Sequence, residues 1–222
     1  MRINVLQHAA DEGPGSIQDW AHAKGYQMYI YHPDQFGLLP TAAQTDMLII
    51  LGGPMSPNDD LPWIQQEREL IQQLLDTQTP IFGACFGAQQ IAKTLGYAVS
   101  KGPAKEVGWA PVYRKSDVIP GLPEQLTALH WHEDMFEVPN DADLLFSSDH
   151  LANQGFVLNH RVVGLQFHFE TKEDNVREMV VNDAAYIQGS VLNQSADEIL
   201  ARQVPAENKN VMFQILDYIS EN

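Results

Sequence analysis

The chain has 222 residues, of which 44% are hydrophobic and 19% charged, so it can fold around a substantial core. It carries 29 acidic against 13 basic residues, a net charge of −16. A surface this negative repels phosphate backbones and anionic lipid, which argues against nucleic acid or a membrane as the main partner.

The chain has one cysteine, Cys85, and therefore cannot form an intrachain disulfide. Its start lacks the uninterrupted apolar core of a signal peptide, and the apolar run at 47–51 is too short to cross a bilayer. We therefore expect a cytoplasmic protein. No low-complexity linker divides the chain, so we also expect a single domain over residues 1–222.

The first half of the chain alternates apolar strands with helical patterns. Strands are predicted at 3–8, 28–32, 46–53 and 80–85. A helix is predicted at 63–78, with one apolar face formed by Trp63, Ile64, Leu70, Ile71, Leu74 and Leu75. Strand, helix and strand in this order pair in parallel, which predicts an α/β fold with helices on both faces of the sheet.

The second half is richer in strands, which predicts a small antiparallel extension of a mostly parallel, three-layer, flavodoxin-like sheet. These strands are expected at 110–114, 126–132, 143–148, 155–160 and 161–169. Two helices follow. The first is expected to start with a capping box of Thr171 and Asp174 and to bury Val176, Met179 and Val180. The second, at 207–220, has an apolar stripe of Val211, Met212, Ile215, Leu216 and Ile219.

The single cysteine lies at the junction between a predicted strand and a helix. Gly83 and Gly87 flank Cys85 at two positions on either side, as in the elbow that exposes a nucleophile on a strained turn. Glycine removes the Cβ atoms that would collide as strand and helix approach. The free N–H groups at the helix start favour thiolate over thiol. A buried structural cysteine is the alternative interpretation.

A histidine and a carboxylate occur together near residue 170. In a strand, residues two apart point to the same side, so His168 and Glu170 are expected to share a face. A carboxylate beside an imidazole can hold its tautomer and stabilise its charged form. Together with Cys85 this gives a nucleophile, a base and an orienting group.

A second histidine pair, His130 and His132, also shares a predicted strand face. Two ligands without a further acidic or cysteine motif do not predict a zinc site. No phosphate-binding G-x-x-x-x-G-K run is present. We therefore expect neither a metal nor another cofactor.

Four motifs in order resemble the class I glutamine amidotransferase family, particularly stand-alone members similar to the glutaminase domain of GMP synthase. The motifs are Leu51 to Pro54, similar to an oxyanion loop; Gly83 to Gln90, similar to a nucleophile elbow; His132 to Asp134, similar to an H-x-D segment; and Gly164 to Glu170, similar to the family's G-[VL]-Q-F-H-P-E strand. The resemblance covers most of the chain.

The resemblance implies a role for each matching residue. Cys85 would be the nucleophile, His168 the general base and acid, and Glu170 the orienting carboxylate. The N–H groups of Gly53 and Phe86 would form the oxyanion hole. Substrate binding would fall to Gly52, Gln89 and His132.

Three residues depart from the family pattern. Phe169 stands where the family usually has proline, which removes a φ constraint before Glu170. Ala88 replaces a bulkier residue and could widen the pocket. Glu133 stands where a small residue is frequent.

These features leave three functional interpretations. The first is hydrolysis of the γ-amide of glutamine through a thioester on Cys85, with the ammonia used by a separate synthase subunit or released. The second is a stand-alone hydrolase of γ-glutamyl peptides or conjugates, for which Ala88 is the indication. The third is a non-catalytic binding or regulatory relative, for which Phe169 is the indication.

Overall fold

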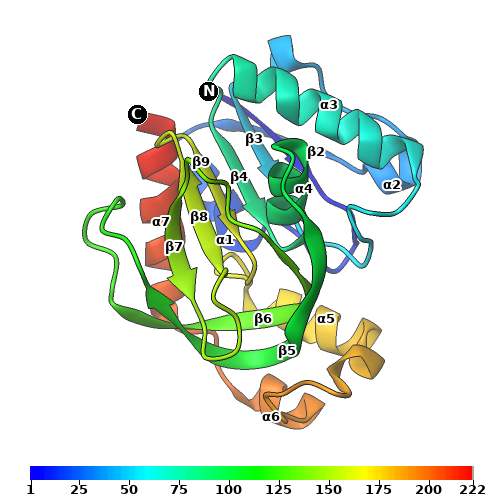
Figure 1. Ribbon diagram of the computed structural model, residues 1–222, viewed down its shortest axis with the longest axis vertical. Coiled ribbons are helices and arrows are strands. Elements are labelled where there is room, and N and C mark those ends of the chain that lie inside the picture. Colours follow the sequence, from blue (N-terminus) through cyan, green and yellow to red (C-terminus); the bar gives the residue numbers. More distant parts are fainter. Residues whose placement is uncertain (222) are drawn as a thin grey trace.

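A single mixed sheet organises the protein in the computed structural model, which describes residues 1–221 (Figure 1). The strand order is β2-β1-β3-β4-β9-β8-β7-β5-β6. The strands are β1 (Arg2–Leu6), β2 (Gln27–Tyr31), β3 (Met47–Ile50), β4 (Ile81–Ala84), β5 (Val99–Arg114), β6 (Gln125–Phe136), β7 (Asp143–Ser147), β8 (Gly155–Leu158) and β9 (Val162–Leu165). The helices are α1 (Gly15–Ala23), α2 (Pro33–Phe36), η1 (Ala42–Gln44), α3 (Pro62–Asp76), α4 (Phe86–Thr94), α5 (Glu173–Asn182), η2 (Ala184–Ile187), α6 (Ala196–Ala201) and α7 (Ala206–Glu221).

The first part of the sheet is parallel and is covered by helices on both faces. Strands β2, β1, β3, β4 and β9 pair in parallel in the order of flavodoxin-like sheets. Alternate residues of β3 enter different cores: Met47 and Ile49 pack in the core with α1 and α7, whereas Leu48 and Ile50 pack in the core with α3 and α4. The predicted α/β class is confirmed.

The second part of the sheet is antiparallel and is larger than the small extension that the sequence predicts. Strands β9, β8, β7, β5 and β6 pair antiparallel, and β5 and β6 reach 16 and 12 residues. The sequence pattern predicts β5 only from residue 110. Its first half contains Gly102 and Pro103 and passes through a register shift between Lys101 and Glu106, which hides the alternation of apolar residues.

The helix after the sheet begins one residue later than the predicted capping box. Its N-cap is Lys172, whose backbone N–H donates to Asn175 Oδ1 at 3.0 Å. Thr171 precedes the helix and is buried, so the predicted box of Thr171 and Asp174 is wrong. The buried faces of both C-terminal helices are confirmed at all eight predicted residues: Val176, Met179, Val180, Val211, Met212, Ile215, Leu216 and Ile219.

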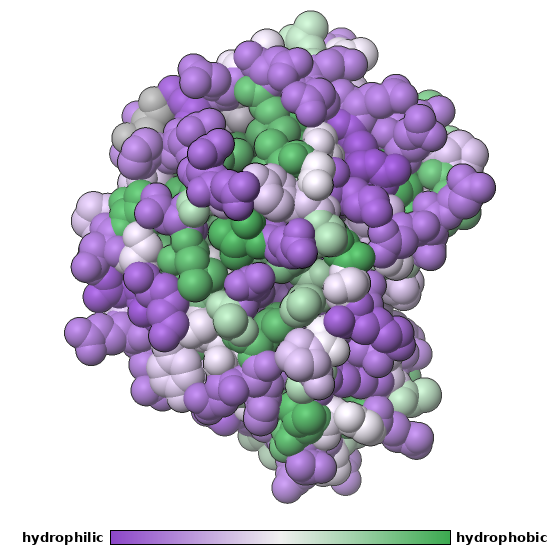
Figure 2. Space-filling view, in the orientation of Figure 1, coloured by the Kyte–Doolittle hydropathy of each residue, from purple (hydrophilic) through white to green (hydrophobic). Residues whose placement is uncertain are grey.

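Hydrophilic residues cover most of the face of the molecule in Figure 2, in keeping with the acidic composition. Smaller hydrophobic areas lie between them. Within residues 1–221, no helix combines the length and the apolar character needed to span a membrane.

Candidate active site

Cys85 lies in a strained turn at the carboxyl end of β4. Its backbone has φ 50° and ψ −109°, and the residue is the N-cap of α4. A Cβ on Gly83 would lie 2.6 Å from the carbonyl carbon of Gly87, and a Cβ on Gly87 would lie 2.1 Å from the carbonyl oxygen of Ile50. Only glycine therefore lets α4 start this close to the sheet.

His168 and Glu170 lie in the segment that leaves β9. The strand ends at Leu165, so the predicted strand to residue 169 is too long. The chain then bridges to β6, where the His168 N–H donates to the Leu129 carbonyl at 2.9 Å. His168 Nδ1 lies 2.5 Å from Glu170 Oε1, and both side chains are almost fully buried. The predicted pairing of imidazole and carboxylate is therefore present, although a bridge and not a strand positions it.

Phe169, which replaces the usual proline, holds this segment by packing. Its ring lies 4.6 Å from the ring of Phe167 and 5.9 Å from that of Phe146, and it is 1% exposed. The carbonyl of Glu170 accepts the N–H of Ser16 at 2.7 Å. Apolar burial and this hydrogen bond fix the backbone that a proline would otherwise restrict.

The thiol and the imidazole influence each other's pKa. Burial raises the pKa of Cys85 above its ordinary value and outweighs the lowering effect of the nearby His168. Burial lowers the pKa of His168, but Glu170 and Cys85 outweigh it and place that pKa well above the ordinary value. The two groups therefore titrate as a coupled pair.

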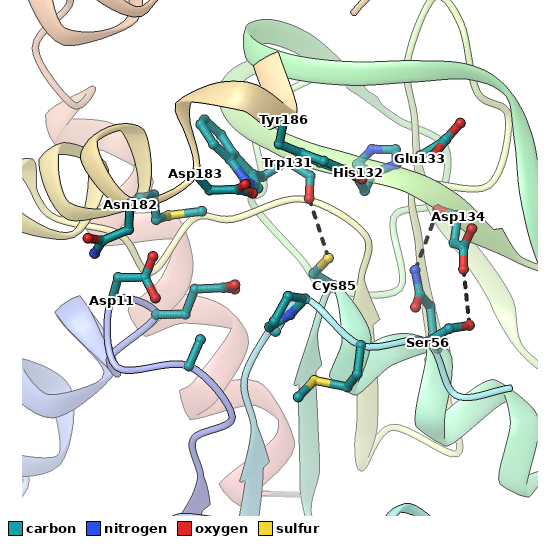
Figure 3. Close-up of a pocket in the computed structure, with 17 residues that line it drawn as sticks. Asp11, Ser56, Cys85, Trp131, His132, Glu133, Asp134, Asn182, Asp183 and Tyr186 are labelled. Carbon is teal, nitrogen blue, oxygen red and sulfur yellow. Dashed lines mark hydrogen bonds between the residues drawn. The ribbon is translucent and has the colours of Figure 1, made fainter. Parts of the chain in front are cut away.

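The sulfur also contacts both neighbouring parts of the sheet. Cys85 Sγ lies 3.8 Å from the Trp131 carbonyl of β6, a contact drawn as a dashed line in Figure 3. Gln166 Nε2 donates to Sγ at 3.7 Å. His168 Nε2 is buried and forms no hydrogen bond with any of the residues 1–221. This nitrogen is therefore not committed to another protein group.

The loop after β3 brings Gly52 and Gly53 to the same edge of the sheet. A Cβ on Gly52 would lie 3.1 Å from the His168 ring and 2.0 Å from a Glu12 carboxylate oxygen. A Cβ on Gly53 would lie 2.8 Å from His8 Cβ. Phe86 is the first residue of α4, so the helix itself does not use its N–H.

A buried ion pair between His8 and Glu67 supports the loop of Gly52 and Gly53. His8 Nδ1 contacts the Leu51 carbonyl at 3.2 Å, and His8 Nε2 contacts Glu67 Oε2 at 2.9 Å. The His8 ring stacks on Trp63 and meets the edge of Phe86. The pKa of His8 is raised, because Glu67 outweighs the lowering effect of burial. These hydrogen bonds and ring contacts hold the loop in place.

Cys85 opens into a cavity of about 460 Å³. Figure 3 shows the sulfur facing a wall that contains Trp131 of β6, Asp183 after α5 and Tyr186 of η2. Gln89 and His132, both predicted to bind substrate, line this cavity, as does Gly53. Among the described residues that line it, none is Lys or Arg and five are carboxylates: Asp11, Glu12, Glu133, Asp134 and Asp183.

The H-x-D segment joins the two walls of the cavity. The Asp134 carbonyl accepts Gln89 Nε2 at 3.4 Å, and Asp134 Oδ2 accepts the Ser56 hydroxyl at 3.2 Å. Glu133 pairs with Lys101 at 3.1 Å. Burial lowers the pKa of His132 to about 3, so this imidazole is neutral.

Ala88 does not widen the cavity, and the prediction that it could is wrong. The residue is fully buried in the core with α3. Its methyl group faces β9, because a Cβ on Gly164 would lie 3.1 Å from Ala88 Cβ. The side chain of Ala88 therefore packs against the sheet and not into the cavity.

Sequence patterns missed several residues of the site. Glu12 lies in a loop without a motif, yet its carboxyl is next to Gly52. Burial raises the pKa of Glu12 to about 7, against a lowering effect of His168. Gln166 falls within the Gly164 to Glu170 motif, which was the available signal for it. Trp131 and Tyr186 carry no such signal.

Comparison with known proteins gives the family. The model of the glutamine amidotransferase class-I family matches residues 21–186, more than half of the chain. The chain belongs to this family, and its α/β fold with a mixed sheet agrees with that assignment.

Relatives resemble the chain along most of its length. It is 28% identical to the glutamine amidotransferase-like protein YfeJ of Salmonella typhimurium, over 99% of this chain and 98% of that protein. It is 30% identical to a glutamine-hydrolyzing GMP synthase subunit of Thermoplasma volcanium, over 64% of this chain and 72% of that protein. The solved structure of a glutamine amidotransferase from Thermotoga maritima superposes with a TM-score of 0.90 at 26% identity, covering 100% of this chain and 99% of that one.

Proposed function

We propose that the protein hydrolyses the γ-amide of glutamine through a γ-glutamyl thioester on Cys85. The observation that carries this proposal is the coupled arrangement of Cys85 on a strained turn, His168 beside it and Glu170 at 2.5 Å from the imidazole. It supplies a nucleophile, a base and an orienting carboxylate in one buried site.

In the first half of the reaction, Cys85 Sγ bonds to the γ-carbonyl carbon while its proton passes to His168 Nε2. Glu170 stabilises the imidazolium that forms, which agrees with its raising effect on the pKa of His168. The same proton then passes to the amide nitrogen as the C–N bond breaks, and ammonia leaves. This step exchanges an amide for a thioester, which water attacks more readily.

In the second half, water attacks the thioester carbonyl while His168 accepts a proton from it. The C–S bond breaks, glutamate leaves, and the proton returns to the sulfur. The carbonyl oxygen carries negative charge in both halves. We assign its stabilisation to the N–H groups of Gly53 and Phe86, at the loop and the helix start that flank Cys85. Each such donor contributes about 3 kcal/mol to the transition state.

A second candidate, hydrolysis of γ-glutamyl peptides or conjugates, is favoured by the size of the cavity. Its volume of about 460 Å³ extends from Cys85 past Trp131 to Tyr186. This space can accept a leaving group larger than ammonia, and the chemistry on Cys85 is unchanged. The non-catalytic interpretation loses its support, because Phe169 leaves the contact between His168 and Glu170 intact.

We also propose that a separate synthase subunit is a partner that uses the ammonia. The supporting observation is the similarity to the Thermoplasma volcanium protein, which by its name is one subunit of a glutamine-hydrolyzing GMP synthase. Ammonia released into water is largely protonated and unreactive, so delivery to an adjacent subunit preserves it for synthesis.

The test is glutamate release from glutamine and from a panel of γ-glutamyl dipeptides, with wild type and Cys85→Ser side by side. We expect turnover by wild type and a loss of about 10⁴-fold in Cys85→Ser at unchanged thermal stability. Strong turnover of dipeptides with little from glutamine would select the second candidate. Equal turnover by both proteins would contradict the Cys85 mechanism altogether.

A further inference from the structure

Three buried side chains meet in the antiparallel part of the sheet, and none of them has a role in the bond-making steps proposed above. Glu106 lies on β5 directly opposite His132 of β6, and His130 lies two residues earlier on the same strand. All three are essentially buried, Glu106 and His130 at 0% exposed and His132 at 2%. Their ligand atoms lie within 4.8 Å of one another, a distance that a single metal ion can bridge.

The spacing of the three ligand atoms is too long for strong hydrogen bonds. Glu106 Oε2 lies 3.5 Å from His132 Nε2 and 3.9 Å from His130 Nδ1. The two imidazole nitrogens are 3.5 Å apart. Charge-assisted hydrogen bonds are usually about 2.7 to 2.9 Å long. A point equidistant from these three atoms lies about 2.1 Å from each, which is the usual length of zinc bonds to histidine and carboxylate.

The carboxylate of Glu106 is held in place but has no strong cation near it. Glu106 Oε1 accepts the Ser148 hydroxyl at 2.8 Å, and Oε2 accepts Gln154 Nε2 at 2.6 Å. The ion pairs found within residues 1–221 join Glu106 only to His130 and His132. A buried carboxylate is costly without a cation. Outer hydrogen bonds of this kind orient metal ligands.

We propose that Glu106, His130 and His132 bind one zinc ion. Two imidazoles and a carboxylate are a known zinc ligand set, with the fourth position left to water. His132 lines the cavity, which gives the ion and this water a route. From the sequence, only the two histidines could be recognised as a possible ligand pair. Glu106 precedes His130 by 24 residues and joins the pair only because β5 and β6 are neighbours in the sheet.

The ion would stabilise the wall that faces the nucleophile. Trp131 lies between the two histidines on β6, and its carbonyl lies 3.8 Å from Cys85 Sγ. Fixing His130 and His132 to β5 therefore fixes the backbone that contacts the thiol. We assign the ion this positioning role, without contact to the reacting carbonyl.

The test measures zinc on the purified chain of residues 1–222, in a Cys85→Ser background so that the thiol cannot bind metal. After chelator treatment, reloading with zinc and desalting, mass spectrometry should find about one zinc per chain. Adding His130→Gln or Glu106→Gln should reduce this below about a tenth. The control His22→Gln, at an exposed histidine on α1, should retain it. Ser148→Ala should weaken zinc binding roughly tenfold.

Two further readouts separate loss of binding from loss of fold. Cobalt in place of zinc should give the strong visible absorption of a four-coordinate site, absent in His130→Gln. Zinc should raise the melting temperature of the Cys85→Ser protein relative to chelator, and this needs no cluster variant to fold. No zinc on that protein, no zinc-dependent rise in melting temperature, or full zinc on His130→Gln would each overturn the proposal.

Discussion

The parallel and antiparallel parts of the sheet contribute different things to the candidate site. The parallel part supplies the strained turn with Cys85 and the loop with Gly53, each at the carboxyl end of a strand. The antiparallel part supplies the facing wall with Trp131 and His132. The reacting groups and the wall that shapes the pocket therefore come from different parts of the fold. Substitutions of the reacting groups should lower kcat, whereas substitutions in the wall should raise KM.

The largest expected effect is that of Glu170→Gln, in the segment that follows β9, the strand that joins the two parts of the sheet. The amide would keep the size of the side chain but lose the charge that raises the pKa of His168. We expect kcat for glutamine to fall by roughly 10² to 10⁴-fold with little change in KM. Steady-state glutamate release measures both constants. Activity within a factor of two of wild type would exclude Glu170 as the orienting group.

The next effect concerns the parallel part alone. In Gly87→Ala the new methyl group would lie 2.1 Å from the Ile50 carbonyl, so strand and helix must separate. We expect a loss of about 3 kcal/mol or more in the free energy of unfolding by urea. Gly13→Ala is the matched control, because its nearest neighbours are side-chain atoms at 3.6 and 3.8 Å. Equal stability of the two variants would disprove the close approach at the elbow.

Glu12 gives a pH-dependent effect of similar or smaller size. Its pKa is raised from 4.5 to about 7, chiefly by burial, so the folded chain keeps the proton in a range where the unfolded chain loses it. This contribution to stability is fully present below pH 4.5 and is lost as pH rises through about 7. The full loss is up to about 3 kcal/mol.

Glu12→Gln should remove this dependence. The free energy of unfolding by urea is measured for wild type and variant at several pH values between 4 and 8. The stability of the variant relative to wild type should increase as pH rises. Glu178→Gln, at an exposed site on α5, serves as the control and should follow the wild-type curve. Parallel curves for Glu12→Gln and wild type would show that burial does not perturb this carboxyl.

The smallest effect tests the far wall of the cavity. Tyr186 packs against Trp131, with ring centroids 6.3 Å apart, and lines the space beyond Cys85. Tyr186→Ala should raise KM for γ-glutamyl dipeptides about tenfold and leave kcat for glutamine nearly unchanged. Tyr113→Ala, outside this cavity, should change neither constant. A fall in kcat for glutamine alone would contradict a role confined to the leaving group.

The sequence predicted those parts of the site that local chemistry determines. The glycines on either side of Cys85 indicated the elbow, because the turn forms only if residues 83 and 87 both lack a Cβ atom. The H-x-E pattern placed His168 and Glu170 together, although the strand that was expected to position them ends earlier. These features depend on residues close to one another in the chain.

Features that depend on tertiary contacts could not be predicted in this way. Ala88 looked like part of the pocket but packs against β9, since only the fold determines which side of α4 faces the sheet. Glu12 and Tyr186 enter the cavity from a loop and a short helix without motifs. Glu106 meets the histidine pair through a strand whose first half carries no apolar alternation.

Detection of the covalent intermediate tests the central claim most directly. The protein is mixed with glutamine or a γ-glutamyl dipeptide, quenched in acid within one turnover, and digested for peptide mass spectrometry. The account predicts a glutamyl group on the peptide containing Cys85, removed by hydroxylamine and missing from Cys85→Ser. Turnover with no adduct on this peptide in wild type, or with an adduct that persists in Cys85→Ser, would contradict the account.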